Sequence, residues 1–279
     1  SQNLGGDPSA AQSAIIVPAP GQADHYYIFT QPRLTGSMQY SLFDMSGLGV
    51  QVGATQVASS TGSSGETIGA TPHRNGRDFW VITADGVANN LLVFLLSPDG
   101  LSGLGVNSKD NSSPVPSGLG QIVFSSDSRT LVVAGGGLNL WTFNNATGEP
   151  SAQTPLAAPA PSVSTVGGGV SVYGAALSPN DSKLYIEFYR PSPTIYQYDL
   201  EQNNARTEIG YMTSCGYGGG LSLAVDGKIY VGCYNSGNPQ PYVGVINNPN
   251  DEAASVGFDP QGVTMSGCIV HYGLPTAIS

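Results

Sequence analysis

Residues 173–199 read YGAALSPNDSKLYIEFYRPSPTIYQYD, and this stretch decides the fold. A first strand-forming run at 173–177 is followed by the turn SPNDS, by KLYI at 183–186 and by TIYQYD at 194–199. Asn, Asp and Ser favour tight turns because their side chains bond the nearby backbone. The stretch therefore predicts three consecutive antiparallel strands.

The same unit occurs five times along the chain. The equivalent residues of the strand after the first turn are Tyr26, Phe79, Leu131, Leu184 and Ile229, and their spacings are 53, 52, 53 and 45. The polar residues that end the following strand are Asp44, Ser97, Asn144, Asp199 and Asn247, spaced 53, 47, 55 and 48 apart. Two independent landmarks give one period, which indicates a structural repeat.

An inner strand opens each unit, at 13–17, 67–70, 121–124, 173–177 and 221–225. Turn-forming residues follow it in the other four units too, at 20–24, 75–78, 125–129 and 225–227. A fourth, edge strand is less distinct, for example at 206–212. Four antiparallel strands in roughly 40–50 residues form the blade of a β-propeller.

We therefore predict an all-β chain that forms a single β-propeller domain over residues 1–279. The five recognisable blades span approximately 12–58, 66–107, 119–156, 172–213 and 220–265, and a closing segment spans 268–279. A sixth, partial blade is the alternative arrangement.

Composition agrees with this fold and excludes several classes of partner. The 38 Gly and 20 Pro residues disfavour helices. The net charge of −10 and the pI near 4.4 provide no basic surface for nucleic acid or anionic membranes. The longest strongly apolar run, 91–96, is far shorter than the roughly 18 residues of a transmembrane helix, so we expect no membrane insertion.

The cysteines and the low charge predict an extracellular or cell-surface protein. Cys215 precedes the fifth inner strand and Cys233 follows its partner strand, so a hairpin-spanning disulfide is one expectation. Cys268 could equally tie the C-terminus to either of them. Disulfides suit an oxidising exterior. A chain rich in Ser, Thr, Asn and Gly with few Lys is typical of secreted bacterial β-proteins.

Signals for enzymatic or metal chemistry are weak. The chain has no G-x-S-x-G elbow, no D-x-D-x-D-G loop and no H-E-x-x-H helix. Most acids lie in turns or at strand ends, and Glu66 and Glu187 are the least conventional. We assign no catalytic residue, no metal ligand and no cofactor; a calcium ion at a turn would be structural. The alternative is a secreted polysaccharide hydrolase or lyase with acids in the channel.

Polar and aromatic residues at the openings of the inner strands predict a binding site at one mouth of the channel. They are Gln12, Thr67, Gln121, Tyr173 and Tyr217. Aromatic rings stack on sugar faces and amides bond hydroxyl groups. The alternative is that these residues plug the channel with hydrogen bonds. We predict a non-enzymatic protein that acts in adhesion, in glycan or protein binding, or in surface assembly, including self-association.

Several segments resemble one family in the same order along nearly the whole chain. They are QSAIIVPAPG (12–21), YYIFT (26–30), YSLFDM (40–45), HRNGRDFWVIT (73–83), YGAALSPNDSKLYI (173–186), IYQYDL (195–200), DGKIYV (226–231), VGVINNPN (243–250) and GLPTAI (273–278). Together they resemble the N-terminal β-propeller region of Bacteroidetes-type secreted, gliding-motility-associated surface proteins. The resemblance implies a propeller at the cell surface and identifies fold better than chemistry.

The family usually has a further blade upstream, with which its GLP segment pairs. No such stretch precedes Ser1 in this sequence. Three arrangements therefore stay open: a fragment, a five-bladed ring, and a ring closed by residues 273–278 packing beside the N-terminal strand.

Overall fold

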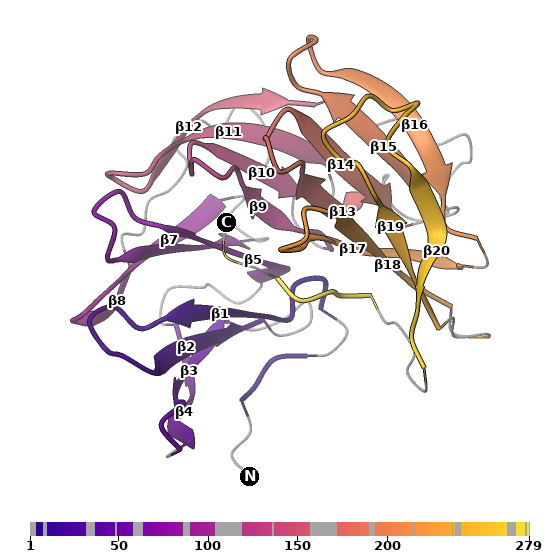
Figure 1. Cartoon of the computed structure of the whole chain (residues 1–279). Coiled ribbons are helices and arrows are strands. Elements are labelled where there is room, and N and C mark those ends of the chain that lie inside the picture. The colour runs from indigo at the N-terminus through magenta and orange to yellow at the C-terminus, as the bar shows by residue number, and fades with distance from the viewer. Residues whose placement is uncertain are drawn as a thin grey trace.

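The computed structural model contains five four-stranded antiparallel sheets, which surround a central channel as the blades of a β-propeller (Figure 1). This confirms the predicted all-β fold class. The structure describes residues 4–7, 10–31, 37–47, 49–57, 64–85, 90–103, 119–135, 137–156, 172–189, 193–213, 215–235, 237, 241–266, 272–276 and 278. Every element within these ranges is a strand or a turn.

Each blade runs in chain order from an inner strand beside the channel to an outer strand. Blades 1 and 2 contain β1 (Ala14–Pro18), β2 (His25–Thr30), β3 (Gln39–Asp44), β4 (Gly49–Gln56), β5 (Ser64–Pro72), β6 (Phe79–Asp85), β7 (Asn90–Ser97) and β8 (Gly100–Gly103). Blade 3 contains β9 (Ile122–Phe124), β10 (Thr130–Ala134), β11 (Leu138–Asn144) and β12 (Glu149–Pro155). Blades 4 and 5 contain β13 (Val172–Leu177), β14 (Lys183–Phe188), β15 (Thr194–Asp199), β16 (Ala205–Tyr211), β17 (Tyr217–Leu223), β18 (Ile229–Tyr234), β19 (Tyr242–Ile246) and β20 (Phe258–Thr264).

The turn after each inner strand contains left-handed backbone. In blades 2 to 5 one residue of the turn has φ between 58° and 78°, and its N–H donates to the carbonyl oxygen three residues earlier; these residues are Gly76, Ser128, Asp181 and Gly227. The turn of blade 1 has two left-handed residues, Gly21 and Asp24. Gly tolerates this conformation and Asp adopts it more readily than most residues. The repeated turn chemistry therefore fixes the same kind of tight hairpin in blades 2 to 5, and blade 1 has a variant of it. We call the side of the propeller formed by these five turns the hairpin face.

Neighbouring blades from 1 to 5 are held together by apolar clusters between their sheets. Between blades 2 and 3, for example, Trp80 and Trp141 are both buried, and Trp80 Nε1 donates to the carbonyl oxygen of Asn145 at 2.9 Å. These interfaces bury the faces that an isolated four-stranded blade would expose.

Blade 5 and blade 1 are joined differently. The C-terminal segment lies between them: Thr276 forms a parallel bridge with Ile15 of β1, and the N–H of Gly220 in β17 donates to the Tyr272 carbonyl at 2.6 Å. Figure 1 shows this segment crossing the centre of the molecule toward β1. Within the described ranges, no apolar cluster joins the two blades directly. The contact with β1 corresponds to the third arrangement that the sequence left open.

The fifth inner strand begins earlier than predicted. The sequence placed it at 221–225, whereas β17 covers Tyr217–Leu223 and includes the run Gly218–Gly219–Gly220. Glycine disfavours strands, but a Cβ at Gly218 would collide with the Phe188 carbonyl oxygen, and one at Gly219 would collide with Gly232. Close approach of neighbouring backbones therefore selects glycine here.

Lys183 forms a buried ion pair with Asp199 inside blade 4 and a second ion pair with the exposed Glu252 of blade 5. Lys183 Nζ contacts Asp199 Oδ2 at 2.6 Å and Glu252 Oε1 at 2.8 Å. Burial of the ammonium group lowers its pKa, but the hydrogen bonds to Asp199 and Glu252 outweigh this effect, so the pKa of Lys183 is raised overall.

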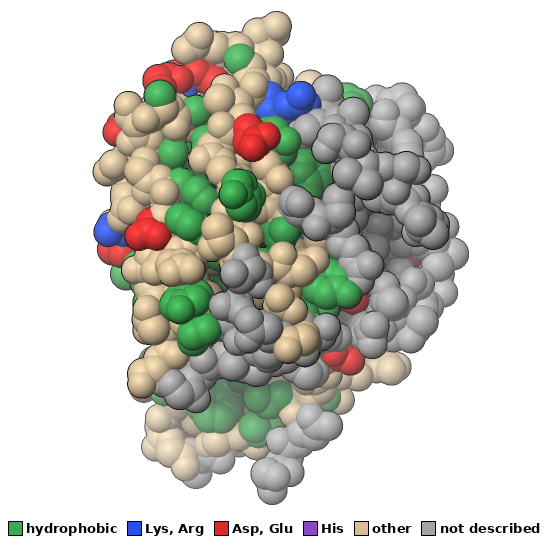
Figure 2. Space-filling model, turned by 90° about the vertical axis from the view of Figure 1, so that its right-hand side faces the viewer, with side chains coloured by type: hydrophobic (Ala, Val, Ile, Leu, Met, Phe, Trp, Pro, Cys, Tyr) green, Lys and Arg blue, Asp and Glu red, His purple; other side chains and the backbone are tan. Residues whose placement is uncertain are grey.

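Figure 2 shows the side of the molecule that carries β16 and β20, where charged side chains are sparse.

Candidate functional site

Two glutamine side chains bond to the inner strands inside the channel. Gln12, just before β1, accepts the backbone N–H groups of Ile68 and Ile122 with Oε1, at 3.0 and 2.7 Å. Its Nε2 donates to the Ile122 carbonyl oxygen at 3.1 Å. One amide from blade 1 therefore joins the inner strands of blades 2 and 3.

Gln121 repeats this arrangement farther around the ring. Its Oε1 accepts the backbone N–H groups of Ala175 and Leu221 at 2.8 and 2.9 Å, and its Nε2 donates to the Leu221 carbonyl oxygen at 3.2 Å. One amide from blade 3 thus joins the inner strands of blades 4 and 5. The two glutamines together link all five blades.

Both predicted glutamines use their side-chain amides to bond the inner strands. Gln12 and Gln121 are 1% and 2% exposed, and the hydrogen bonds are those of the alternative in which they plug the channel. Thr67 is also buried, and its carbonyl oxygen accepts from Gln31 Nε2 at 2.8 Å and from Thr83 Oγ1 at 2.8 Å. Contact of these three residues with a ligand stays a prediction.

The two predicted tyrosines belong to a larger group at the end of the channel where inner strands begin. We call it the tyrosine cluster: Tyr173, Tyr189, Tyr217, Tyr234 and Tyr272. The ring centroids of its contacting pairs are 4.6–6.3 Å apart. Tyr173 is buried, and the other four rings are partly exposed. Their apolar faces and phenol groups together form an amphipathic surface.

The sequence did not reveal three members of the tyrosine cluster. Tyr189 follows β14, Tyr234 ends β18, and Tyr272 lies in the C-terminal segment. The end of the second strand lies on the same side of a blade as the start of the first, because the two strands are antiparallel. Tyrosines at the ends of second strands were therefore the available signal for Tyr189 and Tyr234.

Two buried glutamates lie beside Tyr173. Glu187 Oε2 accepts the N–H of Gly219 at 2.9 Å, while Glu187 Oε1 and the Tyr173 hydroxyl are buried without a hydrogen-bond partner. Glu66 Oε2 accepts the N–H of Ala11 at 3.0 Å. Burial raises the pKa of Tyr173, and the nearby charges of Glu66 and Glu187 add to it.

Burial also raises the pKa of Glu187 well above its usual value, and the hydrogen bond from Gly219 offsets this only in part. The Glu187 carboxyl group therefore keeps its proton well above the pH at which an exposed glutamate loses it. The phenol of Tyr272 has a raised pKa as well, because of burial and its hydrogen bond with Tyr189. Tyr173, Glu187 and Tyr272 therefore stay protonated to higher pH than exposed groups of the same type.

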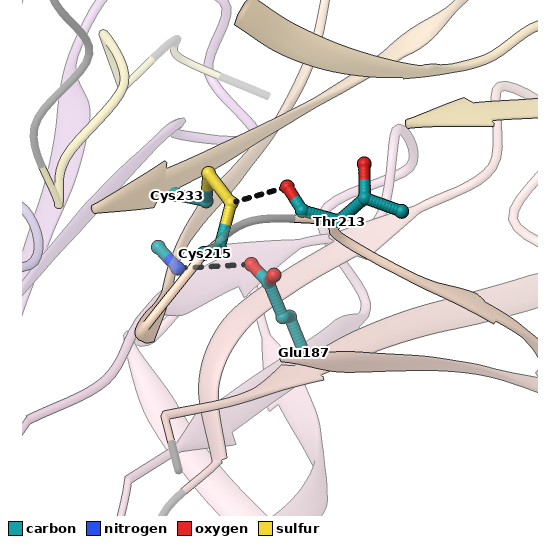
Figure 3. Close-up of a disulfide and its surroundings, with 5 residues drawn as sticks. Glu187, Thr213, Cys215 and Cys233 are labelled. Carbon is teal, nitrogen blue, oxygen red and sulfur yellow. Dashed lines mark hydrogen bonds between the residues drawn. A yellow bond between two sulfur atoms is a disulfide. The ribbon is translucent and has the colours of Figure 1, made fainter. Parts of the chain in front are cut away.

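A disulfide fixes the strands that carry two of the tyrosines. The structure joins Cys215 to Cys233 with a Cα–Cα distance of 5.9 Å, which is the hairpin-spanning pairing that the sequence allowed. Figure 3 shows Glu187 reaching from β14 toward these strands. Cys268 lies outside the described residues. The disulfide holds the start of β17 against the end of β18, next to Tyr217 and Tyr234.

Neither a cluster of metal-ligating side chains nor a membrane-spanning helix occurs in the described ranges. These residues contain no group of three or more His, Cys, Asp or Glu side chains that could hold a metal ion. They also contain no helix that is long and apolar enough to cross a membrane.

Comparison with known proteins supports the fold but names no family. No family model and no curated protein matches the chain. A protein of unknown function from Desulfotomaculum acetoxidans DSM 771 has 14% identity and a TM-score of 0.52 over 94% of this chain and 75% of its own. A Lactobacillus plantarum protein has 14% identity and a TM-score of 0.52, and the match covers 84% of this chain and 66% of that protein. A candidate 6-phosphogluconolactonase from Bacteroides fragilis NCTC 9343 has 12% identity and a TM-score of 0.50, and the match covers 94% of this chain and 85% of that protein. At these identities the likeness concerns the fold alone.

Replacing Gln121 with leucine tests its role as a link between blades. The substitution removes three hydrogen bonds and leaves the N–H of Ala175 and both backbone groups of Leu221 buried without their partner. We expect the free energy of unfolding to fall by about 3 kcal/mol, roughly 1 kcal/mol for each bond. Denaturant unfolding measures it. Gln51→Leu, on the exposed outer strand β4, is the control; an equal loss in both variants would contradict the assignment.

Replacing Glu187 with glutamine tests the buried carboxyl group. A raised pKa means that the folded state binds the proton more tightly than the unfolded state, so the wild-type protein loses stability as the pH rises above about 4.5. The carboxamide of the Glu187→Gln variant would still accept the Gly219 N–H but cannot ionise. The free energy of unfolding of this variant should therefore fall less between pH 5 and 8 than that of the wild type. Exposed Glu201→Gln should follow the wild-type curve. Identical curves for wild type and Glu187→Gln would refute the effect.

Proposed function

We propose that this chain is a binding β-propeller without enzymatic activity, which recognises a glycan at the tyrosine cluster. The observation that carries the proposal is the convergence of four partly exposed tyrosine rings at one channel mouth. Sugars present flat C–H faces, which stack on aromatic rings, and hydroxyl groups, which bond to phenols.

The distribution of charge supports an uncharged polar ligand over a phosphorylated one. The described basic side chains lie away from the cluster: Arg74, Arg77, Arg129, Lys183 and Lys228 adjoin the hairpin face, and Arg206 lies on β16. The chain as a whole carries −10. Anionic ligands need compensating cations, so neutral saccharides fit the described part of the mouth better.

We place this protein outside the cell or at the cell surface, where it would act in adhesion or in a surface assembly. The Cys215–Cys233 disulfide and the low content of charged residues are consistent with this location. The resemblance to Bacteroidetes-type surface proteins supports the same location. A protein partner, or another copy of this chain, is the alternative ligand.

The alternative function is hydrolysis or lysis of a polysaccharide. Its supporting observation is that Glu66 and Glu187 lie beside Tyr173 and that burial raises the pKa of Glu187, as a general acid requires. The two carboxyl groups are at most 1% exposed, so a sugar reaches them only if the tyrosine rings move. The lactonase description of the Bacteroides fragilis protein rests on 12% identity and adds no residue to this alternative.

Substitution of Tyr217 by alanine tests the proposed site. Binding of the purified chain to a panel of neutral and acidic polysaccharides is measured by calorimetry, with reducing and unsaturated ends assayed in the same samples. For a glycan that binds, Tyr217→Ala should weaken the affinity roughly tenfold, because one stacking ring is lost. Tyr211→Ala is the matched control, since Tyr211 is 58% exposed on β16, away from the cluster.

Release of reducing or unsaturated ends would replace the proposal with the enzymatic alternative. Equal weakening by Tyr211→Ala and Tyr217→Ala would remove the cluster as the site, and absence of binding to every polysaccharide would contradict glycan recognition.

A further inference from the structure

The channel contains a second compartment, on the other side of Gln12 and Gln121 from the tyrosine cluster. It is a cavity of about 260 Å³ that reaches the hairpin face at Ser126, Pro179 and Asp181. Inner strands β5, β9, β13 and β17 and the C-terminal segment form its walls. Its size suits a small ligand.

The backbone of four inner strands turns its free edge toward this cavity. Successive residues of a strand direct their N–H and C=O groups to alternate sides. The glutamines show which residues face the channel: Ile68, Ile122, Ala175 and Leu221. The residues two positions farther along face the same way, about 7 Å deeper toward the hairpin face, and all four line the cavity: Ala70, Phe124, Leu177 and Leu223.

At Ile68, Ile122, Ala175 and Leu221, the protein's own glutamine carboxamides bond the backbone groups that face the channel. Gln12 lies across the strands of blades 2 and 3, and Gln121 lies across those of blades 4 and 5. Each amide oxygen accepts two N–H groups and each amide nitrogen donates to one carbonyl. At Ala70, Phe124, Leu177 and Leu223, no side chain of the described residues takes the place of a glutamine. The backbone N–H and C=O groups of these four residues therefore face the cavity in the same arrangement.

The C-terminal segment adds a hydroxyl group to the same cavity. The Thr276 Oγ1 atom is buried without a hydrogen-bond partner, and Thr276 lines the cavity. Ser222 Oγ donates to the Pro275 carbonyl oxygen at 2.9 Å and holds the segment against β17. Buried polar groups normally have a partner, so this hydroxyl also favours a polar ligand.

Charge restricts the class of ligand. Asp181 is the single ionisable residue among the described residues that line the cavity, and it lies at the rim, where its Oδ2 accepts the N–H and the hydroxyl of Ser126 at 2.9 and 2.6 Å. A charged ligand group near the glutamines would be buried without a counter-charge, which is costly. The deep part of the cavity therefore favours neutral groups.

We propose that this cavity binds a small uncharged ligand through a primary carboxamide group, which lies across two adjacent inner strands as the glutamine side chains do. Each glutamine bonds both the N–H and the C=O of one residue, Ile122 or Leu221, and this requires a C=O and an N–H on the same side of the amide. An amidated peptide C-terminus supplies such a group. This site is separate from the tyrosine cluster and does not depend on the proposed glycan recognition there.

The test is an NMR titration of the ¹⁵N-labelled chain with N-acetylalaninamide, which should produce saturable shifts of the backbone amides of Phe124, Leu177 or Leu223. The matched comparison compounds are N-acetylalanine methyl ester and N-acetylalanine methylamide, whose C-terminal groups have no N–H on the same side as the C=O. We expect them to bind at least tenfold more weakly.

Two variants locate the site. Thr276→Phe fills the cavity from the C-terminal segment and should abolish the shifts, whereas Thr207→Phe, on the exposed strand β16, should retain them. Tyr217→Ala should also retain them, so this result is independent of the tyrosine cluster. Thr276→Val, which removes only the hydroxyl group, should weaken binding while keeping the fold.

The proposal is overturned if N-acetylalaninamide does not shift these amides at concentrations of about 20 mM. It is also overturned if the methyl ester and the methylamide bind as well as N-acetylalaninamide. Because these two comparisons use the wild-type chain, they hold even if Thr276→Phe fails to fold.

Discussion

Each inner strand of the propeller has one edge without a neighbouring strand, and the N–H and C=O groups on that edge must find partners inside the channel. Burying such groups without a hydrogen bond costs free energy, so their partners determine how the ring is held together. Gln12 and Gln121 meet this requirement with two side chains of one type, each placed between the strands of two neighbouring blades.

The two glutamines also lie between two compartments of the channel. On one side of the glutamines, inner strands begin, and tyrosines from blades 4 and 5 and from the C-terminal segment meet over Glu187 and Glu66. On the other side, the inner-strand edges and Thr276 face a cavity that opens at the hairpin face. The C-terminal segment contributes Tyr272 to the first compartment and Thr276 to the second, so one short segment closes the ring and completes both compartments.

Much of the fold could be predicted from the sequence because a blade is a local unit. The strand period, the turns around Asp24, Asp181 and Gly227, and the single all-β domain all follow from short-range patterns. The start of β17 could not be predicted, because glycine is a poor strand former and only the neighbouring backbones require it there. The site was harder to predict, because Gln121 and Tyr173 both open inner strands. Only the assembled ring of blades shows that Gln121 bonds two other blades, whereas Tyr173 contacts Tyr189 and Tyr272.

Native-state hydrogen exchange of the backbone amides tests most directly whether Gln12 and Gln121 hold the inner strands together. The N–H groups of Ile68, Ile122, Ala175 and Leu221 bond to the two glutamines, so they should exchange as slowly as the ladder amides of the same blades. Those of Ala70, Phe124, Leu177 and Leu223 face the cavity, so they should exchange faster. If the two sets exchange at the same rate, the glutamines do not hold the inner strands together.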